Sequence, residues 1–156
     1  MRILGLDPGT AATGFGIVAF ADGRLTLELC GVWRPPAGLE LPRRLDFLAS
    51  ALQEVVDRER PAAVSVETVF AAKNVASALK LAHARGVLLA GAARACVPVF
   101  EYEPRLVKKA LVGYGNAEKE QVRAMVLSLL SRQRSRIPLD AADALAVAIC
   151  HVHSGR

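Results

Sequence analysis

Two short apolar runs in this sequence each end in an acidic residue, and this feature restricts the possible folds most strongly. The run ILGL at residues 3–6 is followed by Asp7, and the run AVSV at residues 63–66 is followed by Glu67. Runs of this length and composition predict buried strands, and burying an unpaired carboxylate costs several kcal/mol. We therefore expect both carboxylates at strand ends, beside a positive partner.

The remaining periodicity predicts an α/β fold with a mixed five-stranded sheet flanked by helices. Strands are expected at residues 2–7, 13–20, 25–33, 62–67 and 97–100. Helices are expected at residues 42–60, 76–95, 104–111, 118–130 and 140–151. Asp22 and Gly23 form a typical hairpin turn between the second and third strands, and the first helix predicts a crossover into a parallel strand. The predicted order is βββαβαβααα.

Composition indicates one domain and excludes several classes of protein. The chain has 156 residues, of which 53% are hydrophobic, so we expect residues 1–156 to form a single domain with a full core. The longest uncharged apolar stretch, residues 86–93, is far short of the roughly 20 residues that span a bilayer, so no membrane segment is expected. A strand directly after Met1 leaves no room for a signal peptide, and the three scattered cysteines read as core packing. These features favour a cytoplasmic protein.

Two further acidic residues lie in the last predicted helix. Asp140 and Asp143 are three residues apart, so they share one face at the amino end of that helix, where the helix dipole favours negative charge. If the strands that end in Asp7 and Glu67 are neighbours, all four carboxylates converge. Oxygen ligands of this kind select Mg²⁺ or Mn²⁺, and two such ions are suited to phosphodiester hydrolysis. The sequence therefore predicts a centre with two divalent cations.

Each acid except Asp143 also has a simpler interpretation that its spacing leaves open. Asp140 could be a helix N-cap, Asp7 could belong to an Asx-type turn, and Glu67 could pair with Lys73 at the surface. Asp143 precedes turns that are apolar on every side, which favours a buried target for its carboxylate.

Basic residues outnumber acidic ones between Lys73 and Arg136, and the net charge is +5. They are Lys73, Lys80, Arg85, Arg105, Lys108, Lys109, Lys119, Arg123, Arg132, Arg134 and Arg136. Carboxylates beside a cationic surface are typical of an enzyme that holds and cuts a nucleic acid. Phe70 lies in a loop just after Glu67 and is either core or a platform for an unpaired base. His151 and His153 are expected to face solvent.

The motifs of this chain resemble those of the RuvC family of Holliday-junction resolvases over nearly the whole length. The matching motifs are GLDPGT at residues 5–10 with TG at 13–14, ETVF at 67–70, AKN at 72–74, SALK at 77–80, RG at 85–86, PVFEY at 98–102, VK at 107–108, AEK at 117–119 and DAADALA at 140–146. Two features depart from the family pattern. The turn after the first motif has Ala11 and Ala12 where members often carry a basic residue, and an Arg/Ser-rich insert follows Leu130.

The resemblance implies a ribonuclease H-like fold and a homodimer that makes paired cuts at a four-way DNA junction, in DNA recombination and repair. It implies that Mg²⁺, two ions per site with Mn²⁺ able to substitute, is held by the four acids. Lys108 and Lys119 are implied near the scissile phosphate and Phe70 near junction bases, while Lys73, Lys80, Arg85 and Lys109 are further candidate DNA contacts. Branch-migration proteins RuvA and RuvB are the implied partners.

The symmetry of two paired cuts predicts a dimer with an apolar face on each chain. We expect that face on the helix at residues 76–95, through Leu81, Val87 and Leu88 and the close approach that Gly86 and Gly91 permit.

Three other functions are compatible with parts of the pattern. An Asp-x-Gly-Thr turn also occurs in actin-like ATPases and sugar kinases, but those proteins need a second similar domain. A nuclease of the same fold that processes structured RNA lacks the long match at residues 67–80. A module that binds junctions without cutting gains nothing from four carboxylates where phosphate must lie.

Overall fold

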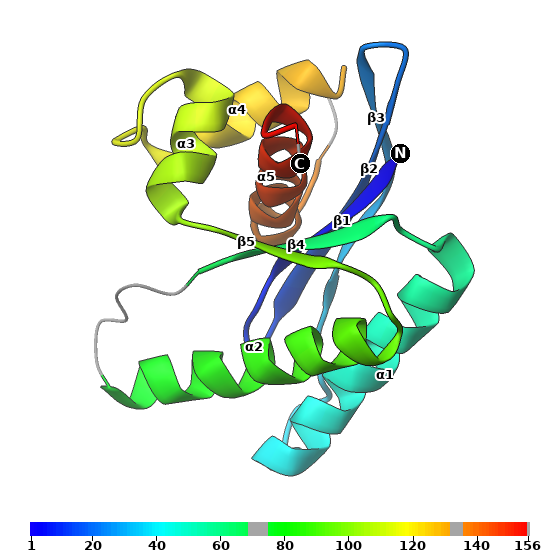
Figure 1. Ribbon diagram of the computed structural model, residues 1–156. Coiled ribbons are helices and arrows are strands. Elements are labelled where there is room, and N and C mark those ends of the chain that lie inside the picture. Colours follow the sequence, from blue (N-terminus) through cyan, green and yellow to red (C-terminus); the bar gives the residue numbers. More distant parts are fainter. Residues whose placement is uncertain (69–74, 132–135, 156) are drawn as a thin grey trace.

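The computed structural model describes residues 1–68, 75–131 and 136–155, and it is built around a five-stranded sheet (Figure 1). The strands are β1 (Arg2–Asp7), β2 (Thr13–Ala21), β3 (Arg24–Trp33), β4 (Ala63–Glu67) and β5 (Val99–Tyr102), in the order β3-β2-β1-β4-β5. Strands β1, β4 and β5 are parallel, and β2 is antiparallel to both of its neighbours. The sheet is therefore mixed, as the sequence predicts.

Helices cover both faces of this sheet (Figure 1). They are α1 (Leu41–Glu59), α2 (Val75–Arg94), α3 (Pro104–Val112), α4 (Lys119–Leu129) and α5 (Leu139–His153). One hydrophobic cluster joins α1 and α2 to one face, and a second joins α3, α4 and α5 to the other. In the described part of the chain, no helix combines the length and the apolar character needed to cross a membrane.

The predicted element order is confirmed, with most boundaries within one or two residues. The hairpin turn has positive φ at both Asp22 and Gly23, as expected for its sequence. The fifth strand starts later than predicted, because Cys96 turns the chain with φ of 56° and the amide of Val97 still bonds to the carbonyl of Ala92. Pro98 then precedes the first residue of β5.

Helix α5 lies directly on the sheet because glycines in β1 and β2 leave room for its backbone. A Cβ added at Gly5 would clash with the carbonyl oxygen of Ala144, and one added at Gly14 would clash with that of Asp140. Every residue from Ala144 to Cys150 is buried, which accounts for the all-apolar sequence of this part of the helix. The glycines therefore fix the amino end of α5 above the ends of β1 and β2.

Two predictions about single residues are wrong. His151 is not at the surface, because it is buried under β5 and its Nδ1 lies 2.7 Å from the hydroxyl oxygen of Tyr102. Cys96 is not core packing, because it occupies the exposed turn after α2. Two other residues fit their predictions, since Cys150 is buried and His153 is exposed.

The predicted interface on α2 is partly wrong, because one side of this helix is used within the chain. Leu88 is fully buried in the cluster with α1, and a Cβ on Gly91 would meet Leu52 of α1. Gly86, in contrast, is exposed, with no atom near its missing Cβ. Any partner must therefore contact the opposite side of α2.

Candidate active site

Asp7 and Glu67 lie at adjacent strand ends on the same face of the sheet. Leu6 pairs with Val66 in the parallel register of β1 and β4, so the acid that follows each of them is next to the other. Leu4, Leu6, Val64 and Val66 all point into the α1/α2 cluster. Because side chains alternate along a strand, Asp7 and Glu67 point to the α5 side. The predicted neighbourhood of these two strands is confirmed.

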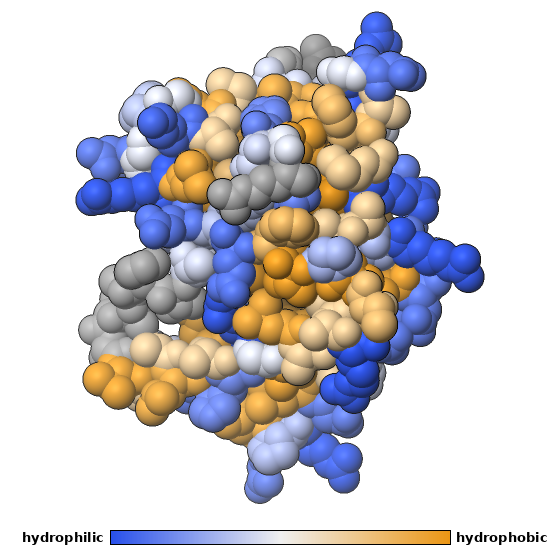
Figure 2. Space-filling model, in the orientation of Figure 1, coloured by the Kyte–Doolittle hydropathy of each residue, from blue (hydrophilic) through white to orange (hydrophobic). Residues whose placement is uncertain are grey.

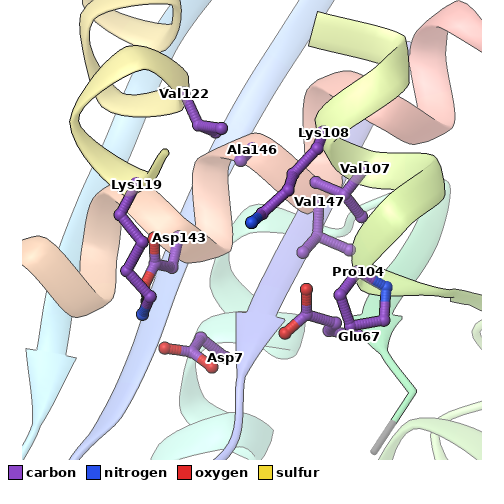
Figure 3. Close-up of a pocket in the computed structure, with 10 residues that line it drawn as sticks. All are labelled: Asp7, Glu67, Pro104, Val107, Lys108, Lys119, Val122, Asp143, Ala146 and Val147. Atoms are coloured by element: carbon purple, nitrogen blue, oxygen red, sulfur yellow. Dashed lines mark hydrogen bonds and ion pairs between the residues drawn. The ribbon is translucent and has the colours of Figure 1, made fainter. Parts of the chain in front are cut away.

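Asp143 joins these two acids from the first turns of α5. Together they line a pocket of about 200 Å³, whose walls are completed by side chains from α3, α4 and α5 (Figure 3). The lining residues are Asp7, Glu67, Pro104, Val107, Lys108, Lys119, Val122, Asp143, Ala146 and Val147. The floor and walls of the pocket thus combine three carboxylates, two amines and apolar side chains.

Two lysines reach the carboxylates from different helices. Lys108 belongs to α3, which follows β5 almost at once, and Figure 3 shows its amine directed into the pocket above Glu67. Lys119 is the first residue of α4, whose start is fixed by a capping box between Glu118 and Gln121. The Lys119 amine donates to Oδ2 of Asp143 at 3.3 Å. Both lysines singled out from the sequence therefore contribute to this pocket.

The electrostatics of the pocket show an excess of negative charge. Burial, and after it the neighbouring Asp143, Glu67 and Asp140, together raise the pKa of Asp7 to about 7, against the opposite effect of Lys119. Burial and then Asp143 likewise raise the pKa of Glu67. The charge of Asp143 is the main reason that the pKa of Lys119 is raised. The lysines alone do not compensate the carboxylates.

A divalent cation fits this donor set. Carboxylate oxygens are its preferred ligands, and a pKa near 7 on Asp7 indicates that more positive charge would stabilise the ionised acid. The carboxylates are not yet closed around a common point, since among residues 1–68, 75–131 and 136–155 no three His, Cys, Asp or Glu side chains are arranged to hold an ion.

Asp140 lies beside the pocket and is not one of its lining residues. Its alternative role as a helix N-cap is wrong, because Pro138 occupies that position and Asp140 lies in the first turn. Its Oδ2 is 3.8 Å from a guanidinium nitrogen of Arg34, in an ion pair with both side chains partly exposed. Sequence reasoning missed Arg34, since a single arginine after a strand and before two prolines carries no recognisable signal.

The other candidate DNA contacts have different surroundings. Lys80 on α2 and Lys109 on α3 are exposed. Arg85 forms an ion pair with Glu101 of β5, and its side chain is 22% exposed. Phe70 and Lys73 lie outside the described residues, so the alternative pairing of Glu67 with Lys73 stays a prediction.

Comparison with known proteins identifies one family. The family described as "Crossover junction endodeoxyribonuclease RuvC" matches residues 3–151. A crossover junction endodeoxyribonuclease RuvC from Syntrophomonas wolfei is 48% identical over 156 residues, which cover 100% of this chain and 91% of that protein. Another from Chloroflexus aurantiacus is 47% identical over 154 residues, covering 99% and 94%. The structure of Thermus thermophilus RuvC in complex with a Holliday junction substrate aligns with a TM-score of 0.93 at 36% identity, covering 100% and 95%.

Proposed function

Because this chain belongs to the RuvC family of crossover junction endodeoxyribonucleases, we propose that it resolves four-way DNA junctions by hydrolysing phosphodiester bonds during recombination and repair. The observation that carries this proposal is the pocket in which Asp7, Glu67 and Asp143 face Lys108 and Lys119. Such a pocket can hold cations for chemistry and attract a phosphate at the same time. The related structure with a Holliday junction supports the choice of substrate.

Asp7, Glu67, Asp140 and Asp143 are the proposed ligands for two Mg²⁺ ions, with Mn²⁺ able to substitute. The bound cations would activate a water and stabilise the leaving oxygen of the scissile bond. Because the pKa of Asp7 is raised to about 7, this carboxyl still carries its proton part of the time at neutral pH. Binding of a cation to the ionised carboxylate would therefore release protons. Lys108 and Lys119 are proposed to stabilise charge that develops on the phosphate.

The proposed active unit is a homodimer, because two symmetric cuts need two sites and each chain has one pocket of this kind among its described residues. The outer side of α2 supports this, since apolar and small side chains recur there at helical spacing and form a pale to orange strip in Figure 2. They are Val75, Leu79, Ala82, Gly86, Ala90 and Ala93. Val75 and Leu79 are 76% and 55% exposed, which is unusual for large apolar residues unless a partner covers them.

Further parts of the proposal rest on the family. The described residues form one nuclease domain, which acts in the cytoplasm where chromosomal DNA lies, with RuvA and RuvB as branch-migration partners. Phe70, Lys73, Lys80, Arg85 and Lys109 are proposed to contact DNA outside the pocket.

A cleavage assay tests the function directly. The protein is incubated with Mg²⁺ and an end-labelled four-way junction, and in parallel with a duplex of the same sequence, a single strand and a structured RNA. We expect paired nicks in strands of like polarity on the junction alone. Asp143→Asn is the variant and Asp57→Asn, an exposed acid on α1, is the matched control with the same chemical change. Equal cutting of duplex and junction, or of the RNA, would contradict the proposal.

A further inference from the structure

Both acids of α5 are paired with a cation from another element of the fold. Lys119 at the start of α4 pairs with Asp143 at 3.3 Å, and Arg34 just after β3 pairs with Asp140 at 3.8 Å. The carboxylate side chains are 38% and 41% exposed, and their basic partners are 79% and 59% exposed. These are therefore solvent-accessible pairs that can open without disturbing the core.

Arg34 reaches Asp140 from the carboxyl edge of the sheet. Strand β3 ends at Trp33, which pairs with Thr13 at the start of β2, and β2 pairs Gly14 with Asp7. Strand β3 therefore ends at the same edge as β1, so Arg34 flanks the candidate active site on the β3 side. Lys108 flanks it on the β5 side, because α3 follows that strand. Cations thus stand on both sides of the carboxylates.

Asp140 is paired with Arg34 and does not line the pocket. Asp7, Glu67 and Asp143 line that pocket, and Asp140 does not. Within the part of the chain that the structure describes, no three acids close around one point. Because Oδ2 of Asp140 lies 3.8 Å from the guanidinium of Arg34, the arginine competes with a divalent cation for this carboxylate.

Exposed ion pairs contribute only about 0–1 kcal/mol, so a divalent ion can displace the guanidinium easily. The released guanidinium would be left at the edge of a site that holds phosphate. Its planar, multiply donating group matches a phosphate better than an amine does. One ion would therefore both recruit Asp140 and free a cation for DNA.

We propose that Arg34 is a positioning residue that exchanges partners: it holds Asp140 aside in the metal-free protein, and binds a phosphate of the DNA once a divalent cation takes Asp140. The proposal rests on the proposed function, since it needs both a cation and DNA at this site. In this exchange, binding of the cation to Asp140 frees Arg34 for a phosphate, and binding of a phosphate to Arg34 frees Asp140 for the cation. Metal binding and junction binding therefore strengthen each other.

Binding of Mg²⁺ to the DNA-free protein, measured by calorimetry, tests the first half. Arg34→Ala should bind Mg²⁺ about two- to fivefold more tightly than the wild type, the range that an exposed pair allows. The control Arg58→Ala removes an equally charged, ion-paired and similarly exposed arginine of α1, and should leave the affinity unchanged. Arg34→Lys, which keeps the charge, should remain close to the wild type.

A double-mutant cycle separates the exchange from a general effect of charge. In an Asp140→Asn background, Arg34→Ala should no longer change Mg²⁺ affinity if Arg34 acts through Asp140. If Arg34→Ala tightens Mg²⁺ binding equally in both backgrounds, or in neither, the proposal is overturned. Neither measurement depends on cleavage, so a failure here is distinct from a failure of the proposed function.

Junction binding in Ca²⁺ tests the second half. Arg34→Ala should weaken binding and reduce the dependence of log affinity on log salt by about 0.9, the value for one lost phosphate contact on duplex. The opposite signs, with tighter metal and weaker DNA, are the signature of an exchange. A purely structural role would instead lower the melting temperature and weaken both, and an unchanged salt slope would eliminate the phosphate contact.

Discussion

The hydroxyl oxygen of Tyr102 lies 2.7 Å from Nδ1 of His151, and this contact joins the end of β5 to the last turn of α5. Both side chains are buried, and the ring of Phe100 lies 4.5 Å from that of His151. Tyr102 also pairs with Glu67 in the register of β4 and β5. The contact therefore ties the helix that carries Asp140 and Asp143 to the strand beside Glu67.

Replacing Tyr102 by phenylalanine should destabilise the protein by about 1 kcal/mol, because a buried hydrogen bond is lost while the ring is kept. Urea unfolding monitored by circular dichroism measures this. Tyr114→Phe is the control, since Tyr114 is 48% exposed and the same change there should be nearly neutral. Equal stability of the two variants would show that the contact contributes nothing.

Removing any one carboxylate of the proposed centre should nearly abolish cutting and leave junction binding in place. The variants are Asp7→Asn, Glu67→Gln, Asp140→Asn and Asp143→Asn. Each removes a ligand for a cation and leaves the basic side chains that hold DNA. Cutting of a labelled junction in Mg²⁺, beside a gel-shift assay in Ca²⁺, separates the two effects. A variant that cuts like the wild type would exclude its residue from the centre.

The metal-free protein should lose stability as the pH rises from about 4 to above 7. The pKa of Asp7 is raised to about 7 in the folded state, so its proton stabilises the fold fully below the unfolded value, and this contribution disappears as the pH passes the folded one. Melting temperatures in EDTA across this range measure the loss. Asp7→Asn should flatten the profile and melt higher than the wild type at pH 8. An unchanged profile in that variant would assign the effect to other groups.

Lys108→Ala and Lys119→Ala should lower the cutting rate more than the junction affinity, if both amines stabilise charge that forms at the phosphate. Single-turnover rates at saturating protein and gel-shift affinities give the two quantities. Lys119→Ala should additionally bind Mg²⁺ more tightly, because its amine occupies Asp143 in the metal-free state. Equal losses in rate and affinity would mean that the lysines only hold DNA.

Leu79→Glu should produce a folded monomer that resolves no junctions, since it places a charge on the outer side of α2 without touching the core. Sedimentation at micromolar concentration measures the assembly. Leu88→Glu is an instructive comparison, because Leu88 is fully buried and the same change there should unfold the chain. A wild type that stays monomeric even with junction DNA would rule out the paired-cut mechanism.

Much of the fold was predictable because its signals are local. Apolar runs, helical periodicity and the Asp-Gly turn were enough for the element order, and the family and its endonuclease class are also confirmed. The convergence of Asp7 and Glu67 followed from one rule about parallel strands. These predictions needed no knowledge of distant contacts.

The predictions that failed concern which tertiary contacts a side chain makes in the folded chain. In the sequence, His151 resembles a surface residue and Leu88 resembles an interface residue. Only the packing of His151 against β5 and of Leu88 against α1 shows that both are buried. The pairing of Arg34 with Asp140 joins residues more than a hundred positions apart, and no local pattern encodes it. The sequence could identify the acids but not which basic side chains pair with them in the metal-free protein.

The close glycine contacts between α5 and strands β1 and β2 also determine how cutting activity should be lost on heating. Its proposed ligands stand on the innermost strand, on the neighbouring strand and on a helix that cannot lift without opening the core. Local unfolding of surface loops should therefore leave the carboxylates in place, whereas unfolding of the core should displace all of them at once. On heating, cutting activity should persist to the edge of global unfolding and then disappear over the same few degrees.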